Sequence, residues 1–225
     1  MTLRLTKQET ILGGVYLLLQ MLVIPVAVSV LCVFLGITSL AAVNLICFFL
    51  NAALALACFR RLLRQSLQNC AGRWGETVLT AAKGFGLYWL LSTAAAVLIL
   101  TLEPDYLNIN DASVNTMIDE FPVLMPLAVV FAAPLAEECL FRGWIFTGLA
   151  RKSLPLAYFV TACCFAAVHV TGYIGSYDPR TLLLCLLQYI GPSVALCWTC
   201  HKADSLLAPL LLHIIINTIA LFTTR

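Results

Sequence analysis

Charged side chains are scarce in this chain. Aspartate, glutamate, lysine and arginine together make up 11% of its 225 residues, whereas a soluble domain carries about 25%. Hydrophobic side chains make up 62%, which excludes an ordinary soluble domain and indicates an integral membrane protein whose surroundings are the lipid bilayer. The formal net charge is only +2. Because no basic stripe is present to neutralise phosphates, we expect no nucleic-acid partner.

The sequence also has no proline-rich, collagen-like or repeated segment, which excludes fibrous and solenoid architectures. The sequence also favours a retained first helix over a cleavable signal peptide. Arg4 and Lys7 precede an apolar run, but that run continues from Ile11 to about Leu35, far beyond the roughly 7–15 apolar residues of a signal peptide. We therefore expect the run to be retained as the first membrane helix.

Long apolar segments are abundant. Seven of them approach the roughly 20 residues that an α-helix needs to cross a bilayer. They lie at about 11–35, 39–59, 77–101, 122–151, 154–172, 181–199 and 204–223. The predicted fold class is therefore all-α, a polytopic transmembrane helical bundle of about seven to eight spans.

The fourth segment, 122–151, is too long for one simple span. Proline suits the first turn of a helix, so we expect Pro134 to divide this segment. Residues 122–133 would then form a short re-entrant or interfacial helix, and the number of segments would rise to eight.

Lysine and arginine gather at alternate ends of the segments. They are Arg4, Lys7, Arg60, Arg61, Arg64, Arg73, Arg151, Lys152 and Lys202. The other ends carry Arg180, Arg225 and an acidic loop at 102–121. Since basic loops favour the cytoplasmic side, the pattern predicts a cytoplasmic N-terminus and an outer C-terminus.

Ten cysteines are present. Most lie in apolar segments, where cysteine acts as a small hydrophobic residue, so we expect them to be structural. Cys197, Cys200 and His201 form a CxxCH pattern, which is typical of haem attachment. That attachment needs an extracytoplasmic site, whereas the charge pattern places this loop inside. We therefore expect no haem, and we expect His201 to be a solvated loop residue.

The most informative feature is the run Glu137–Arg142, which reads EExxxR inside an apolar segment. Each charge in hydrocarbon costs about 2.5–3.5 kcal/mol, so three charges within six residues indicate a function. Glu138 and Arg142 are i,i+4 neighbours and are predicted to pair. Glu137 is rotated by about 100° and is left free for chemistry. Three further polar residues lie in other apolar segments: His169, His213 and Asn217.

Helical spacing brings these residues to a similar depth. Glu137 lies sixteen residues before Ser153 and His169 sixteen after it, so both lie about 24 Å from the turn of an antiparallel hairpin. His213 and Asn217 are i,i+4 neighbours on the last segment and reach a comparable level. A lone intramembrane histidine or asparagine can also be a simple interhelical hydrogen-bond partner, and a Glu–Arg pair can be purely structural.

Three motifs resemble those of the CPBP family, the type II CAAX prenyl endopeptidases and their bacterial bacteriocin-processing and self-immunity relatives. The family's EExxxR stands here as Glu137–Arg142, its FxxxH as Phe165–His169 and its HxxxN/D as His213–Asn217. The resemblance covers about residues 120–223, with the motifs in order and in separate segments.

The resemblance implies an intramembrane endopeptidase that hydrolyses membrane-associated, leader or CAAX-type peptide substrates. Glu137 would be the general base that activates water, and His169 would hold and polarise that water. His213 and Asn217 would stabilise the oxyanion of the tetrahedral intermediate. Donors aimed at a developing oxyanion gain strength where water is scarce, so this division of roles suits a site inside the membrane.

The metal requirement is the main alternative within this function. Glu137, His169 and His213 could form a zinc shell, and the family has been labelled as metalloproteases. It is also described as metal-independent glutamate proteases. The chain has no HExxH, and the amide of Asn217 is an unusual zinc ligand but a useful donor. We therefore favour an enzyme without a metal or other cofactor, with zinc as the alternative.

The motifs also divide the chain. Residues 1–119 are expected to form N-terminal transmembrane helices without motifs, and 120–225 the CPBP-like catalytic core. In that core the resemblance gives Glu138 and Arg142 a structural supporting role. The chain is short and lacks regulatory extensions, so it resembles bacterial members, and we expect it in a bacterial cell membrane.

Two other functions use the same residues. One is a bacteriocin self-immunity membrane protein of this fold with little or no proteolysis. The other is a transporter or proton relay using the Glu137 and His169 pair, although the inverted repeats typical of transporters are not evident. The charge pattern also places both residues in the outer half of the bilayer, whereas a CAAX-type substrate approaches from the cytoplasm.

Overall fold

The computed structural model describes residues 2–223, which form helices and turns without a strand element. Within that range, six helices are long and apolar enough to cross a membrane. They are Lys7–Phe34, Leu40–Cys58, Trp74–Leu102, Leu124–Ala150, Leu154–Tyr173 and Pro179–Ala203. The all-α polytopic prediction is confirmed.

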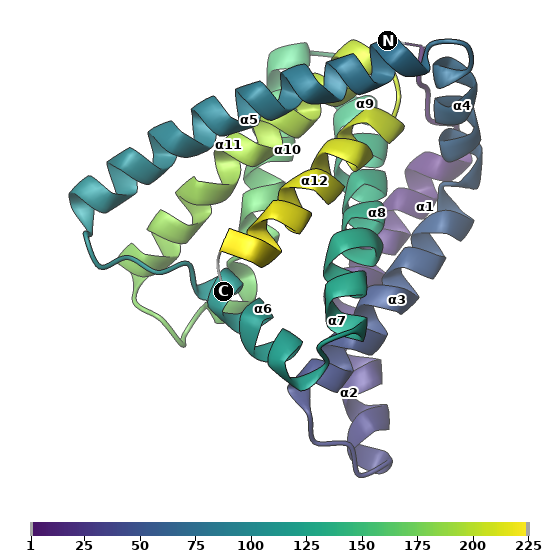
Figure 1. The fold of residues 1–225 in the computed structure, drawn as a ribbon. Helices are drawn as coiled ribbons and strands as arrows, with labels where there is room; N and C mark the ends of the chain where they lie inside the picture. Colours follow the sequence, from purple (N-terminus) through teal and green to yellow (C-terminus); the bar gives the residue numbers. More distant parts are fainter. Residues whose placement is uncertain (1, 224–225) are drawn as a thin grey trace.

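Shorter elements complete or connect these long helices (Figure 1). The first long helix consists of α1 (Lys7–Leu18) and α2 (Ile24–Phe34), joined by a π-helical turn, and α3 is Leu40–Cys58. Next come α4 (Arg60–Cys70), α5 (Trp74–Leu102) and α6 (Ile109–Glu120). The fourth long helix contains α7 (Leu124–Leu127), α8 (Ala133–Glu137) and α9 (Thr147–Ala150). The chain ends with α10 (Leu154–Val168), α11 (Pro179–Ala203) and α12 (Leu207–Thr223).

The helix α12 is shorter than the segment predicted for it. It has 17 residues, about 25 Å at 1.5 Å per residue, compared with about 30 Å of hydrocarbon. It begins only at Leu207 because the chain turns at Asp204, whose φ of 50° ends α11. The outer C-terminus predicted from charge lies at residues 224–225, outside the described residues.

Polar caps set the beginnings of the helices. Thr6 and Glu9 form a capping box in which each side chain binds the other's backbone N–H. Ser39 accepts from the N–H of Ala42 at 3.0 Å and begins α3. Ser153 caps α10 through the N–H of Leu156, so the hairpin turn that sequence spacing assumed is found at that residue.

The predicted break at Pro134 is wrong. The helix continues from Leu124 to Ala150, and residues 122–133 form no separate re-entrant or interfacial helix. A π-helical segment, Ala128–Ala132, precedes the proline. Its wider i→i+5 bonding lets the helix pass a residue that has no N–H to donate.

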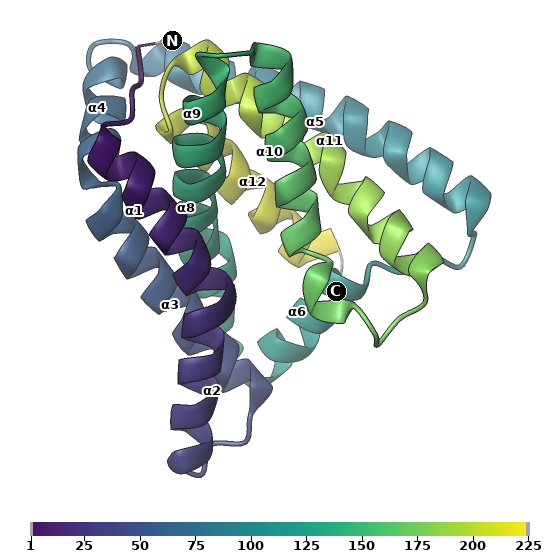
Figure 2. The ribbon, with the colours of Figure 1, turned by 180° about the vertical axis from the view of Figure 1, so that it is seen from behind.

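The Leu124–Ala150 helix is the most buried of the six long helices, and it occupies the centre of the bundle. Helices α1, α3 and α4 lie on one side of it, α5 and α11 on the other, and α12 crosses between them (Figures 1 and 2). The largest buried cluster draws on both parts of the chain, with Tyr16, Phe59 and Leu62 beside Phe141 and Phe146. The EExxxR run is therefore shielded from lipid by protein.

Close approach of α5 to α11 depends on two glycines. A Cβ atom at Gly84 would lie 2.0 Å from Thr199 Oγ1, and one at Gly191 would lie 3.0 Å from the Cβ of Leu91. Neither position leaves room for a larger side chain, so these glycines set the spacing of the helix pair.

The ends of the bundle differ in charge. The N-terminus, α4 and the first turns of α5 lie at one end, together with the α9–α10 turn (Figure 1). Arg60, Arg64 and Lys152 are exposed there. At the other end, Arg180 pairs with Glu103 at 3.2 Å. The alternation in the sequence thus corresponds to two distinct ends, and assignment of the basic end to the cytoplasm stays a prediction.

Candidate active site

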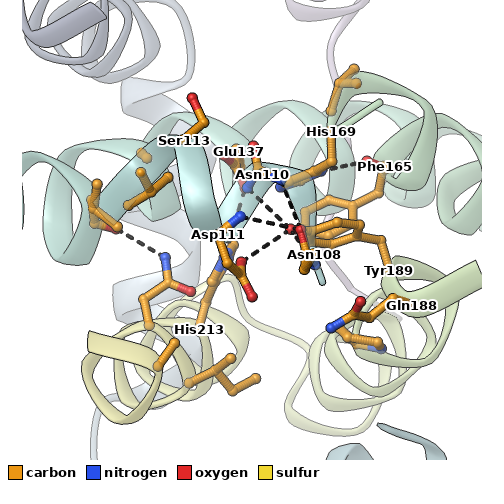
Figure 3. Close-up of a pocket in the computed structure, with 18 of the residues that line it drawn as sticks. Asn108, Asn110, Asp111, Ser113, Glu137, Phe165, His169, Gln188, Tyr189 and His213 are labelled. Atoms are coloured by element: carbon orange, nitrogen blue, oxygen red, sulfur yellow. Dashed lines mark hydrogen bonds and ion pairs between the residues drawn. The ribbon is translucent and has the colours of Figure 1, made fainter. Parts of the chain in front are cut away.

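A cavity of about 940 Å³ lies between the helices. All four residues that sequence reasoning assigned to catalysis line it: Glu137, His169, His213 and Asn217. Polar side chains from α6 and α11 line its other side (Figure 3). The cavity therefore brings together the three helices that carry the motifs and other helices that carry none.

The predicted Glu138–Arg142 ion pair is confirmed. Arg142 Nη1 donates to Glu138 Oε1 at 2.9 Å, and both side chains are almost completely buried. Arg142 Nη2 also donates to Ser193 Oγ at 3.0 Å and to the Ser193 carbonyl at 3.3 Å. The guanidinium lies over the ring of Phe165, 4.5 Å from its centroid. The charge is thus held by a carboxylate, a neighbouring helix and an aromatic face.

Glu138 has a second partner that sequence spacing did not reveal. Its Oε1 lies 2.8 Å from His213 Nδ1. A carboxylate can only accept, so Nδ1 carries the proton of this bond. Glu138 therefore fixes the orientation and the protonated nitrogen of His213, in addition to holding Arg142.

A π-helical segment, Glu138–Phe146, carries most of the EExxxR run. Single π-turns often mark functional sites. Here the Arg142 carbonyl accepts from both the backbone N–H and the hydroxyl of Thr147, the hydroxyl at 2.8 Å. The sequence was interpreted as a regular α-helix, and nothing in its local pattern predicts the wider turns.

Glu137 turns away from the Arg142 ion pair and lines the cavity, with 18% of its side chain exposed. Its Oε2 lies 3.7 Å from His213 Nε2. Sequence spacing named His169 as its neighbour at equal depth. His169 does line the same cavity, but the ionic contact of Glu137 is with His213, because α12 packs against α8 at this level.

His169 follows the last residue of α10, where the chain leaves the helix. Its Nδ1 lies 2.8 Å from the Phe165 carbonyl. A carbonyl only accepts, so Nδ1 carries the hydrogen, and Nε2 is left as an acceptor. The imidazole stacks on Tyr189 with centroids 4.1 Å apart and planes 20° apart.

Asn217 reaches the cavity from α12, one turn after His213. Its Nδ2 donates to the Val129 carbonyl at 2.9 Å, inside the π-helical segment before Pro134. One of its two amide hydrogens is thus engaged by the backbone, and the other is available to a ligand.

Sequence reasoning missed a polar cluster at the start of α6. Asn110 Nδ2 lies 3.0 Å from the Tyr189 hydroxyl and Asn108 Nδ2 lies 3.3 Å from it. The hydroxyl in turn lies 3.5 Å from Asp111 Oδ1. Burial raises the pKa of the Asp111 carboxyl. The signal is the Asn-Ile-Asn-Asp run at 108–111, which lies inside the acidic loop of the sequence.

The metal requirement of the site stays a prediction. Within residues 2–223, no group of three or more histidine, cysteine, aspartate or glutamate side chains is arranged to hold a metal ion. The Nδ1 atoms of His169 and His213 are bound to the Phe165 carbonyl and to Glu138, which leaves each Nε2 atom outside these bonds, as is also typical of metal-binding histidines. We derive no catalytic step through a metal.

The CxxCH pattern lies inside α11. Cys197 and Cys200 are fully buried, and all ten cysteines are free thiols. His201 was expected to be a solvated loop residue, and that expectation is wrong. It belongs to the last turn of α11 and packs edge-on against Phe146, with ring centroids 6.4 Å apart.

Comparison with known proteins identifies relatives. A family model described as type II CAAX prenyl endopeptidase Rce1-like matches residues 119–219. The UPF0177 protein YxdF of Lactococcus lactis subsp. lactis (strain IL1403) is 25% identical over 154 residues, which cover 67% of this chain and 80% of the relative. No solved structure matches. The matched range contains the EExxxR, FxxxH and HxxxN motifs, whose residues meet at the same cavity, and these comparisons support the resemblance to the CPBP family.

Proposed function

We propose that this chain, which is similar to type II CAAX prenyl endopeptidases, is an intramembrane protease that hydrolyses peptide bonds with a water molecule activated by Glu137. The proposal rests on the different surroundings of two carboxylates that are neighbours in the sequence. Glu138 is buried in the ion pair with Arg142, whereas Glu137 faces the cavity without an arginine partner. A carboxylate in that position is available as a base.

Glu137 and His169 together can orient the water. His169 offers Nε2 as an acceptor because its Nδ1 hydrogen is bound to Phe165. The Glu137 carboxylate offers a second acceptor in the same cavity. A water molecule that gives one hydrogen to each presents its oxygen lone pair to a peptide carbonyl, and Glu137 takes the proton as the new C–O bond forms.

His213 and Asn217 would stabilise the oxyanion. Asn217 has one amide hydrogen left for this purpose. Because the Nδ1 hydrogen of His213 is bound to Glu138, His213 can donate from Nε2 only with a second proton. Glu137 Oε2 lies 3.7 Å from Nε2 and can pass on the proton that it takes from water. When the tetrahedral intermediate collapses, the C–N bond breaks and the proton taken from water ends on the leaving amine. One oxyanion donor is worth about 10²–10³ in rate.

The cavity suits a membrane-associated peptide. Its polar residues share the lining with Phe48, Phe85 and Trp89, which can contact an apolar stretch of substrate. A leader peptide, a CAAX-type tail or a membrane-protein tail would fit this description. We infer a location in a bacterial cell membrane with the N-terminus in the cytoplasm, on the grounds of the charge alternation and of the similarity to a bacterial protein.

The test compares Glu137→Gln with Glu120→Gln, which alters an exposed carboxylate at the end of α6. Each full-length variant replaces the wild type in its host, and the membrane proteome is searched for unprocessed precursors. We expect precursors to accumulate with Glu137→Gln and not with Glu120→Gln. Normal processing with Glu137→Gln would remove the catalytic assignment.

The accumulating precursor then becomes the substrate for the purified wild-type protein. We expect cleavage to continue after exhaustive treatment with a chelator. Loss of cleavage on chelation, with recovery on adding zinc alone, would contradict the metal-independent mechanism and leave Glu137 as a ligand.

A further inference from the structure

Tyr189 and His169 form the closest ring pair of the catalytic cavity. Their centroids are 4.1 Å apart and their planes differ by 20°. Phe165 contacts the imidazole from another side, with centroids 4.6 Å apart and planes 45° apart. His169 itself is joined to its own helix by the Nδ1 bond to the Phe165 carbonyl. That bond sets which nitrogen is protonated, while the two rings restrict rotation of the imidazole plane.

The hydroxyl of Tyr189 is held by the start of α6 (Figure 3). A phenol can accept two hydrogen bonds and donate one. Here Asn110 and Asn108 donate at 3.0 and 3.3 Å, and Asp111 accepts at 3.5 Å. Asn108 is also the cap of α6, because its Oδ1 accepts from the backbone N–H groups of Asn110 and Asp111. The phenol is therefore bound to a rigid helix terminus.

A second tyrosine, Tyr173, also binds the start of α6. Tyr173 lies four residues after His169, and its hydroxyl donates to Asn110 Oδ1 at 3.4 Å. The segment that leaves α10 is thus connected to α6 by Tyr173, while α11 is connected to α6 by Tyr189. The imidazole of His169 lies between these two connections, in a cavity that a substrate must enter.

We propose that Tyr189 is a positioning residue for His169, with its ring setting the imidazole plane and the start of α6 setting the ring. The proposal rests on the proposed function, since His169 must aim Nε2 at the attacking water. A buried tyrosine with a satisfied hydroxyl can be simply a core residue. Here its face lies on the imidazole of a motif histidine, and all three hydroxyl partners come from one short segment, 108–111.

A positioning role predicts that substitution of Tyr189 lowers kcat and leaves KM nearly unchanged. Tyr189→Leu removes the stacking ring, and because small misplacements of reacting groups cost up to about 10²-fold, we expect kcat to fall roughly 10- to 100-fold with KM nearly unchanged. Tyr189→Phe keeps the ring and loses the hydroxyl bonds, so a loss of about 2- to 10-fold is expected. Tyr158→Phe is the control, since Tyr158 lies on α10, the helix that His169 follows, but its ring packs against Phe146.

A second measurement does not depend on proteolysis. The chain has three histidines, so the imidazole resonances of the labelled full-length protein in detergent are few enough to assign. Loss of the stacked ring in Tyr189→Leu should move the His169 ring-proton resonances and leave those of His201 unchanged. Tyr189→Phe keeps the ring, so its His169 resonances should stay close to those of the wild type. This variant also provides the test if Tyr189→Leu does not fold.

The outcomes separate the two proposals. If Glu137→Gln leaves processing intact, the protease mechanism fails, whereas the resonances still test the stacking. If His169 resonances and kcat are both unchanged in folded Tyr189→Leu, the positioning role is overturned. It is also overturned if the resonances move but kcat does not, or if Tyr189→Phe is as defective as Tyr189→Leu.

Discussion

His213 and Glu138 share a buried contact of 2.8 Å between Nδ1 and Oε1. The same carboxylate oxygen accepts from Arg142 Nη1 at 2.9 Å. One residue of the EExxxR motif thereby binds the first residue of the HxxxN motif, and the two motifs form a single charged network. Glu138 is more than support for its own helix, because it also orients a residue of the proposed oxyanion site.

Replacement of Glu138 should damage stability severely. Glu138→Gln keeps the volume but removes the charge, which leaves Arg142 buried without a carboxylate. Breaking a buried ion pair from one side costs about 3–5 kcal/mol. We expect a large fall in the thermal unfolding temperature of the detergent-solubilised protein, with Glu120→Gln as the exposed control. A double replacement, Glu138→Leu with Arg142→Met, should recover much of the loss. Equal stability of Glu138→Gln and the wild type would contradict the network.

Much of the site was predictable from local spacing. The i,i+4 relation gave the Glu138–Arg142 pair, and the equal distances from Ser153 placed Glu137 and His169 at one depth. The contact between His213 and Glu138 was not predictable, because it depends on how α12 is rotated against α8. Rotation about a helix axis is decided by packing between helices, and a nearly uniform apolar segment does not encode it.

Two features of the fold lay beyond sequence reasoning for different reasons. The π-helical segments depend on which carbonyl each N–H finds, and propensity scales do not distinguish that choice from an α-helix. The start of α6 looked like a solvated acidic loop because its composition is polar. Its asparagines instead bind the Tyr189 hydroxyl, a long-range contact that composition alone cannot indicate.

The close approach of α5 and α11 makes Gly84 sensitive to substitution. A Cβ atom there would lie 2.0 Å from Thr199 Oγ1, so Gly84→Ala should cost about 1–3 kcal/mol of unfolding free energy through overpacking. Gly86→Ala is the matched control two residues away, where a Cβ would meet nothing within 4 Å. It should be neutral or slightly stabilising. Adding Thr199→Ala to Gly84→Ala removes the clashing atom and should restore most of the stability.

Asp111 should make stability depend on pH. Burial raises the pKa of its carboxyl in the folded protein, so the unfolded state loses its proton first. The folded state is therefore favoured below the usual aspartate pKa of about 4, and that advantage is lost as pH rises through the folded pKa. Asp111→Asn does not ionise and retains an oxygen that can accept from Tyr189. Its unfolding temperature should match the wild type near pH 4 and exceed it at pH 7–8. A difference that is constant with pH would contradict this account.

The orientation of the bundle can be tested at its two ends. Arg64 and Asp105 are both exposed, and they lie on opposite sides of the α5 segment. In Arg64→Cys and Asp105→Cys, a membrane-impermeant maleimide applied to intact cells should label only the cysteine at 105, because basic ends favour the cytoplasm. The unsubstituted chain controls for its ten free cysteines, several of which are buried. Labelling of both sites from outside would contradict the crossing of the membrane by α5. Labelling of site 64 alone would show that the topology is the inverse of the predicted one. The α6 end, with Asn108 and Asp111 beside the cavity, would then face the cytoplasm, from which a CAAX-type substrate approaches.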